Sequence, residues 1–176
     1  MKKKIVFFDG DGTLWYPKTT KYEEKPHWIY HNEKTKDDPN EHIELTPFVV
    51  ETLRELKEKG ITIVILSANP YSPKIANKIL KDKVKYFKLT NYIDETHATP
   101  PIMKAKGEYI LKTLKKFNLN KKDALMVGDT YLWDCKPAKD VGTDALLINS
   151  KYRKDCPSGS RAKRVISDIN KVLNFV

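Results

Sequence analysis

The feature that most constrains this chain is a short apolar run that ends at two closely spaced carboxylates, Ile5-Val6-Phe7-Phe8-Asp9-Gly10-Asp11-Gly12-Thr13. Residues 5–8 are continuously β-prone, which is typical of a strand buried on both faces of a parallel sheet. The following Gly/Asp cluster indicates a turn. Side chains two residues apart on an extended backbone point the same way. We therefore expect Asp9 and Asp11 to lie together at the carboxyl end of a buried strand, where open α/β sheets bind ligands.

Further apolar segments predict the other strands of this sheet: residues 61–66, 84–89, 124–127 and 144–149. Helices are expected to begin at Pro47, Pro73 and Lys106, because capping residues and helically spaced apolar side chains follow one another there. Ile75, Ile79 and Leu80 would face inward from the second of them. Shorter helices are expected at about residues 134–140 and 167–176. Alternating strands and helices predict an α/β, Rossmann-like three-layer sandwich with a parallel sheet of about five strands, in a single domain spanning residues 1–176.

Residues 15–45 interrupt this alternation. The segment is polar, carries three prolines and shows no sustained helical period. We expect it to be a flap or minimal cap insertion beside the site, with one short hairpin pairing residues 28–30 with residues 42–44. Its aromatic residues either pack the flap down or form a substrate wall, and we favour packing: Trp15, Tyr16, Trp28 and Tyr30.

Composition limits the class of protein. The chain has 176 residues, of which 40% are hydrophobic and 32% charged, as in a soluble globular domain. No apolar stretch reaches membrane-spanning length, and the run before Asp9 is too short for a signal peptide. The two cysteines, Cys135 and Cys156, form no Cys-x-x-Cys pair, which favours a reducing cytoplasmic location. A net charge of +10 is consistent with phosphorylated or nucleic-acid partners, but the lysines are scattered along the sequence and no RNA-binding motif is present.

Two more carboxylates follow a strand near the end of the chain. Residues 124–127 lead into Gly128-Asp129-Thr130, and Asp134 comes five residues after Asp129. In a parallel sheet these acids would converge with Asp9 and Asp11 on one pocket. Because carboxylates crowded together repel one another, such a pocket needs a cation, and an all-oxygen ligand set favours Mg²⁺ over Zn²⁺. Asp134 could alternatively be only a capping residue of the helix that it begins.

Groups suited to binding an anion come from two other segments. The strand at residues 61–66 ends in Ser67-Ala68-Asn69, so that a hydroxyl stands beside Asp9. Ser67 could equally be a simple turn residue. Lys104 and Lys106 stand at the start of a helix, where the helix dipole disfavours a cation, and an anion between lysine and helix would resolve that mismatch. The sequence does not decide between the two lysines, although we favour Lys106.

These motifs together resemble the signature of the haloacid dehalogenase-like (HAD) hydrolases, most of which are phosphatases. The resemblance implies that Asp9 is the nucleophile that forms an aspartyl-phosphate and that Asp11 is the general acid/base. It also implies phosphate binding and loop support by Gly10, Thr13, Ser67, Ala68, Asn69 and Lys106. The implied Mg²⁺ ligands are Asp9, Asp11 through its backbone carbonyl, Asp129 and Asp134, the last directly or through water.

Within the superfamily the chain is most similar to the magnesium-dependent phosphatase-1 type small phosphatases, through Asp-Gly-Thr-Leu-Trp and the short insert after it. Its fourth motif is Gly-Asp rather than the Asp-Asp of that group, so the subgroup stays open. The resemblance implies a monomer or homodimer that hydrolyses a small phosphorylated substrate or a phosphotyrosine-like group. A phosphatase of nucleic-acid ends and a non-catalytic, metal-binding regulatory domain are the alternatives.

Overall fold

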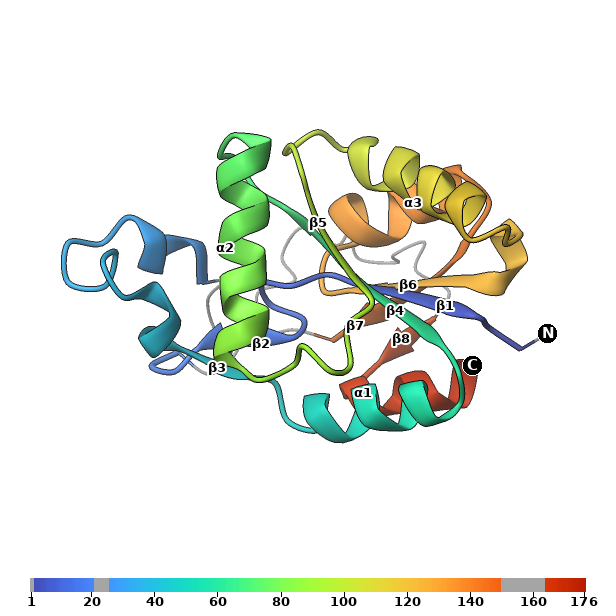
Figure 1. The fold of residues 1–176 in the computed structure, drawn as a ribbon, viewed down its shortest axis with the longest axis horizontal. Coiled ribbons are helices and arrows are strands. Elements are labelled where there is room, and N and C mark those ends of the chain that lie inside the picture. Colours follow the sequence, from blue (N-terminus) through green and yellow to red (C-terminus); the bar gives the residue numbers. More distant parts are fainter. Residues whose placement is uncertain (1, 21–25, 150–163) are drawn as a thin grey trace.

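A six-stranded sheet forms the centre of the fold in a computed structural model that describes residues 2–20, 26–149 and 164–176. Its strand order is β5-β4-β1-β6-β7-β8, and every neighbouring pair is parallel (Figure 1). The strands are β1 (Ile5–Phe8), β4 (Thr62–Ala68), β5 (Glu95–Thr99), β6 (Ala124–Gly128), β7 (Asp144–Ile148) and β8 (Val165–Ile166). The Rossmann-like parallel sheet predicted from the sequence is thereby confirmed, with β8 as one strand more than expected.

Helices cover both faces of the sheet, as a three-layer sandwich requires. Successive residues of β1 point to opposite faces: Val6 and Phe8 belong to one buried apolar cluster, and Ile5 and Phe7 belong to the other. The first cluster is completed by α1 (Val49–Glu58), α2 (Pro73–Tyr86) and the 3₁₀ helix η5 (Ile169–Phe175). The second is completed by α3 (Ala105–Lys116) and α4 (Lys136–Asp140). Because both faces are buried, the strands read as continuous apolar runs.

The position of β1 decides where the site lies. β1 pairs with β4 on one side and β6 on the other, with Phe8 opposite both Ile65 and Val127. The backbone N–H of Asp9 still donates to the carbonyl of Val127, at 2.9 Å. All three strands are parallel, so the residues that follow them emerge at the same edge of the sheet. This register brings the segments after Phe8, Ile65 and Val127 together.

The strand predicted at residues 84–89 is wrong. Val84 lies on α2, and β5 instead occupies Glu95–Thr99, which is not among the strands predicted from the sequence. The alternation at residues 84–89 competes with a helical spacing, in which Ala76, Leu80 and Val84 form one buried stripe. Extending the helix to Tyr86 keeps that stripe against the sheet. The same stripe leaves Ile75, expected to face inward, 52% exposed.

The insertion after β1 forms a small two-stranded sheet. β2 (Trp15–Pro17) pairs antiparallel with β3 (Ile43–Leu45), and the segment between them carries two 3₁₀ helices, η1 (Pro26–Tyr30) and η2 (Pro39–His42). The expected hairpin partner of β3 was residues 28–30, which the structure instead places in η1. A prolyl residue at the start of each 3₁₀ helix fits that geometry, because a prolyl nitrogen needs no acceptor there.

The end of the insertion is fastened to its beginning. Thr46 donates its backbone N–H to the carbonyl of Leu14 (2.9 Å) and its hydroxyl to the carbonyl of Thr13 (2.8 Å). The left-handed conformation of Phe48 (φ 68°) then delays α1 until Val49, two residues later than the expected start at Pro47. The insertion therefore leaves and re-enters the core at nearly one point.

No helix among the described residues has both the length and the apolar character needed to cross a bilayer. Cys135 is buried, whereas Cys156 lies outside the described residues.

An ion pair at the amino end of the sheet gives a test of the fold. Lys3, which is buried, donates through Nζ to Oδ2 of Asp144 (2.6 Å) and to the carbonyl of Lys122 (2.7 Å). The hydrogen bond from Lys3 is the main reason that the pKa of Asp144 lies below its usual 3.8. We expect Asp144→Asn to lower the free energy of unfolding at pH 7 by about 1 kcal/mol, a modest value because Asp144 is half-exposed.

Since the folded-state pKa of Asp144 is lowered, its contribution is present above the unfolded pKa and is lost as pH falls through the folded pKa. Urea denaturation should therefore show the difference between Asp144→Asn and the wild type shrinking from about pH 7 to about pH 3. Asp37→Asn, at an exposed position, serves as the control and should change little at either pH. A difference that persists undiminished at low pH would contradict the assignment.

Candidate active site

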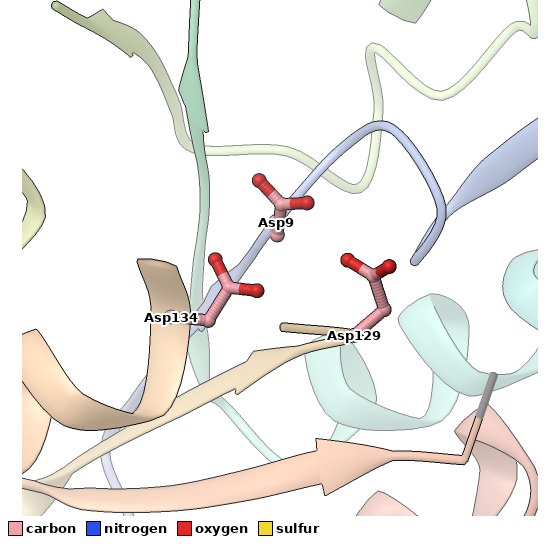
Figure 2. Close-up of side chains that lie close together, drawn as sticks. All are labelled: Asp9, Asp129 and Asp134. Atoms are coloured by element: carbon pink, nitrogen blue, oxygen red, sulfur yellow. The ribbon is translucent and has the colours of Figure 1, made fainter. Parts of the chain in front are cut away.

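Three buried carboxylates meet at the carboxyl edge of the sheet. Asp9 follows β1, Asp129 follows β6, and Asp134 lies in the π-helical turn Tyr131–Cys135. One carboxylate oxygen from each lies within 4.8 Å of the others (Figure 2). Their exposed fractions are 6%, 1% and 0%. The convergence predicted from the sequence for these three acids is present, and all the donors are oxygen atoms suited to a hard cation.

Lys106 supplies the positive charge opposite this cluster. Its Nζ donates to Oδ1 of Asp9 and to Oδ1 of Asp134, each at 2.6 Å, and its side chain is only 3% exposed. Burial lowers the pKa of the Lys106 ammonium, but the charges of Asp134 and Asp9 outweigh burial and hold it above the usual value. One ammonium faces three carboxylates, and like charges 4 Å apart repel by about 4 kcal/mol at an effective dielectric constant near 20. The cluster therefore suits a divalent cation.

Asp134 is held rigidly by the residues just before it. Its Oδ2 accepts the backbone N–H of Thr130 (2.9 Å) and the Thr130 hydroxyl (3.0 Å), while its Oδ1 faces Lys106. Gly128 leaves the space that the Asp134 carboxyl fills, because a Cβ built there would overlap it. Asp134 therefore does more than cap a helix: it connects β6 to the lysine of α3.

Close packing of α3 against α4 fixes the position of Lys106 relative to the carboxylates. α3 approaches α4 at Gly107, where an added Cβ would lie 2.6 Å from the carbonyl oxygen of Pro137. Only a residue without a side chain allows that approach. This close approach keeps the neighbouring Lys106 within hydrogen-bond distance of the carboxylates.

A small cavity opens beside the cluster. Its volume is about 150 Å³, and its lining consists of Asp9, Asp11, Ser67, Ala68, Lys106, Thr130, Trp133 and Asp134. Ser67 ends up there because it lies two residues beyond Ile65, the neighbour of Phe8. Larger hollows of about 670 and 590 Å³ lie elsewhere, but none of the predicted site residues lines them. The cavity is far smaller than the sites of drug-sized ligands.

The carboxylate of Asp11 lines the cavity but does not belong to the three-acid cluster. Lys83 of α2 donates to its Oδ1 at 2.8 Å, the hydroxyl of Tyr30 lies 3.2 Å from both oxygens, and the Trp15 indole N–H also donates to Oδ1. Burial raises the pKa of Asp11, but Lys83 and the other donors outweigh burial and hold the pKa below its usual value. The family resemblance implied that Asp11 binds the metal through its backbone carbonyl, and that remains a prediction.

The remaining predicted residues divide into two groups. Ser67, Ala68 and Lys106 line the cavity, but Gly10, Thr13 and Asn69 are not part of its lining. Thr13 is wholly buried, and Asn69 uses its side-chain oxygen to accept the backbone N–H of Tyr71 (3.0 Å).

Gly10 has a packing role in the structure, and Lys104 lies outside the carboxylate cluster. A Cβ on Gly10 would lie 2.7 Å from the Trp15 ring, so Gly10 lets that ring pack against the turn. Lys104 is largely exposed and pairs with Glu108 at 3.1 Å, so the site lysine is Lys106, as favoured from the sequence.

Sequence reasoning missed Lys83, Thr130 and Trp133. Because residues 84–89 were predicted to form a strand, the helix before them was not followed as far as Lys83. With α2 recognised as one helix, the spacing from Ala76 through Leu80 to Lys83 would have revealed a lysine on a buried stripe. Thr130 and Trp133 lie inside the segment from Asp129 to Asp134, where only the acids carried a signal.

Comparison with solved structures supports the fold. A haloacid dehalogenase-like hydrolase family protein from Streptococcus pneumoniae has a TM-score of 0.73 and is 15% identical, over 98% of each chain. At that identity the likeness concerns the fold alone.

Curated relatives add sequence similarity. The chain is 28% identical over 165 residues to glyceraldehyde 3-phosphate phosphatase of Pyrococcus furiosus, covering 88% of this chain and 64% of the relative. It is 28% identical over 117 residues to ribulose-1,5-bisphosphate 5-phosphatase of Halopiger xanaduensis, covering 65% of this chain and 46% of the relative. The chain thus spans less than two thirds of the length of either relative.

A family model gives the decisive match. The model described as haloacid dehalogenase-like hydrolase matches residues 12–148, which include β4, α3, β6 and the turn that carries Asp134. The match extends over well more than half of the chain and agrees with the carboxylate and lysine geometry at the edge of the sheet. The chain belongs to the haloacid dehalogenase-like hydrolase family.

Proposed function

We propose that this protein is a phosphatase that hydrolyses a small phosphomonoester through an aspartyl-phosphate on Asp9, with Mg²⁺ as its cofactor. The observation that carries the proposal is the meeting of Asp9, Asp129 and Asp134 with the ammonium of Lys106 beside a small cavity. A lone acidic cluster would support only metal binding. The added lysine and the hydroxyl of Ser67 are groups that neutralise phosphoryl oxygens.

The donor set fits a magnesium ion. Asp9, Asp129 and Asp134 offer three carboxylate oxygens within 4.8 Å of one another, and neither histidine nor cysteine belongs to this group. Asp9 and Asp129 would hold the ion with the backbone carbonyl of Asp11, and Asp134 would bind it directly or through water. When bound, the ion supplies charge neutralisation at the phosphoryl group and orients it toward Asp9.

The chain's own residues account for the bonds made and broken. A carboxylate oxygen of Asp9 attacks phosphorus, and the bond from phosphorus to the leaving oxygen breaks. Asp11 gives a proton to that leaving oxygen and takes one from the water that then attacks the aspartyl-phosphate. The bond from phosphorus to the Asp9 oxygen breaks in that second step, which releases inorganic phosphate and restores the Asp9 carboxylate. Lys106 holds Asp9 in place and balances negative charge on the phosphoryl oxygens, and Ser67 donates a hydrogen bond to one of them.

The protonation of Asp11 must alternate during this cycle. With its pKa lowered by Lys83 and the neighbouring donors, Asp11 is ionised in the resting site, the state that accepts a proton from water. A phosphate bound in the adjoining cavity places negative charge beside Asp11. Such a like charge favours the protonated carboxyl, which is the state needed to assist the leaving group.

Two observations favour a small phosphorylated metabolite as the substrate. The cavity of about 150 Å³ accommodates little beyond a phosphoryl group and a short attached chain. The two curated relatives are named as phosphatases of glyceraldehyde 3-phosphate and ribulose 1,5-bisphosphate. We extend that substrate class, phosphorylated small carbohydrates, to this chain.

The net charge of +10 favours a second candidate, a phosphatase of nucleic-acid ends. Hydrolysis of a 3′- or 5′-phosphorylated oligonucleotide with steep salt dependence, and none of a sugar phosphate, would support it instead. A phosphotyrosine peptide is the third substrate to be assayed, beside the sugar phosphate and the oligonucleotide.

We further propose that residues 1–176 act as one catalytic domain with residues 15–45 as its flap, because β2 and β3 pair with each other and both ends of the insertion meet at Thr13, Leu14 and Thr46.

The nucleophile assignment predicts a near-complete loss of activity on a conservative change. Asp9→Asn removes the attacking oxygen's charge and should lower turnover of sugar phosphates on the order of 10³-fold or more. EDTA should abolish wild-type turnover, and added Mg²⁺ should restore it. Circular dichroism should show both proteins folded, and Asp37→Asn should keep wild-type activity. Near-native turnover by Asp9→Asn would refute the proposed nucleophile.

The two neighbouring lysines give a matched pair of variants. Lys106→Met removes the ammonium between Asp9 and Asp134 and should reduce kcat/KM by about 10²- to 10³-fold. Lys104→Met makes the same chemical change two residues earlier, on an exposed side chain paired with Glu108, and should retain the wild-type kcat/KM. Steady-state kinetics on one sugar phosphate decides between them. Equal losses in both variants would count against the role of Lys106.

The space that Gly128 leaves for Asp134 predicts an effect on metal binding. Gly128→Ala should displace the Asp134 carboxyl and weaken Mg²⁺ binding by about 10- to 100-fold, as calorimetric titration without substrate would show. Gly60→Ala is the control, because Gly60 has a φ of 73° but open space around it. It should lower stability by about 1–2 kcal/mol and leave Mg²⁺ affinity unchanged. Unchanged Mg²⁺ affinity in Gly128→Ala would argue against Asp134 as a ligand.

A further inference from the structure

A second network, separate from the three-acid cluster, surrounds the carboxylate of Asp11. Its donors come from three elements: the indole of Trp15 on β2, the hydroxyl of Tyr30 on η1, and the ammonium of Lys83 on α2. Trp15 is only 4 residues from Asp11, whereas separations of 19 and 72 residues show that the fold brings Tyr30 and Lys83 to it. β2 and η1 belong to the insertion at residues 15–45, so the network joins that insertion to the core helix α2.

Lys83 is the unusual member of this network. Its side chain is 4% exposed, although lysine is rarely buried without a partner. Its Nζ lies 2.8 Å from Asp11 Oδ1 and also contacts the Tyr30 hydroxyl. The ammonium stands 4.4 Å from the centre of the Tyr30 ring and 5.3 Å from that of Trp15, both within cation–π range. Among the described residues, the groups seen to compensate this buried charge are Asp11 itself and two aromatic residues that also donate to Asp11.

The network approaches Asp11 from the side away from solvent. The side chain of Asp11 is 28% exposed and lines the cavity, whereas Lys83 and Trp15 are buried and do not line it. Trp15 is further fixed by stacking on Phe87, with ring centres 5.9 Å apart. Three donors thus converge on Oδ1 of Asp11, and the same residue lines the cavity in which a phosphoester would bind.

We infer that Lys83, Tyr30 and Trp15 form a positioning cluster that holds the Asp11 carboxylate against the cavity and so controls proton transfer to the leaving group. The inference rests on the proposed function, in which Asp11 exchanges a proton with the leaving oxygen and then with water. Lys83 touches no reacting atom, and the proton moves only between Asp11 and those oxygens. A carboxyl free to rotate would lose the orientation that makes proton transfer efficient.

A purely structural role is the competing explanation, because the same contacts fasten the insertion to α2. The two roles differ in their dependence on the leaving group. Proton donation matters greatly when an alkoxide leaves and little when a stable phenolate leaves. A structural role would affect both substrates alike.

The experiment compares Lys83→Met with Lys81→Met and Lys85→Met, two exposed lysines on the same helix. Glycerol 3-phosphate and 4-nitrophenyl phosphate serve as substrates with a poor and a good leaving group. Lys83→Met should lower kcat/KM on glycerol 3-phosphate by about tenfold to a hundredfold and kcat/KM on 4-nitrophenyl phosphate by less than about threefold, because kcat/KM reports the phosphoryl transfer to Asp9 in which the leaving group departs. The later attack of water on the aspartyl-phosphate is the same for both substrates and does not enter this comparison. Both control variants should match the wild type on both substrates.

A double-mutant cycle tests whether Lys83 acts through Asp11. Asp11→Asn removes the proton-transfer group, so adding Lys83→Met to it should cause less than about a twofold further loss. Tyr30→Phe provides a second variant if Lys83→Met does not fold, since it removes one hydroxyl and keeps the ring beside the ammonium. It should show the same substrate dependence with a smaller loss in kcat/KM.

Equal losses on both substrates, or multiplicative losses in the double variant, would overturn the positioning role. So would wild-type kinetics of a folded Lys83→Met. Failure of the proposed function looks different: the wild type would hydrolyse neither substrate, or Asp11→Asn would keep wild-type rates. An active wild type that depends on Asp11 but not on Lys83 would refute this inference alone.

Discussion

The contact on which the site depends is the bridge that Lys106 makes between Asp9 and Asp134. Three buried carboxylates cannot be gathered in one place without compensation, because their mutual repulsion opposes folding. The ammonium of Lys106 joins the acid after β1 to the acid in the turn after β6, at 2.6 Å on each side. Two glycines make room for that bridge: Gly107 lets α3 approach α4, and Gly128 leaves space for the Asp134 carboxyl.

Much of this arrangement could be predicted because it follows from strand order. A buried apolar strand ending in Asp9, another ending before Asp129, and a parallel sheet are enough to place both acids at one edge. Asp134 and Lys106 were predicted from their positions at helix starts, and the structure brings both to the same cluster. The family resemblance assigned the chemical roles, and those roles remain proposals, as do the single-domain organisation, the cytoplasmic location and the oligomeric state.

The parts that could not be predicted depend on contacts between segments distant in sequence. Residues 84–89 alternate like a strand, but the stripe from Ala76 through Leu80 extends the helix to Tyr86, and packing against the sheet overrides local pattern. The surroundings of Asp11 needed three elements at once: β2, η1 and α2. Nothing in the short sequence of η1, Pro-His-Trp-Ile-Tyr, indicates that Tyr30 reaches a carboxylate nineteen residues earlier.

The two borders of the sheet have a consequence for self-association. At one border, α2 packs against β5, and the side-chain oxygen of Asn77 accepts the backbone N–H of Ala98 that faces away from β4. At the other, among the described residues, β8 is only two residues long. Within the part of the chain that the structure describes, neither border offers a long unpaired ladder to another chain, an arrangement that natural sheets use against edge-to-edge aggregation. Two copies of this protein would therefore meet through helix or loop surfaces, not by extending the sheet.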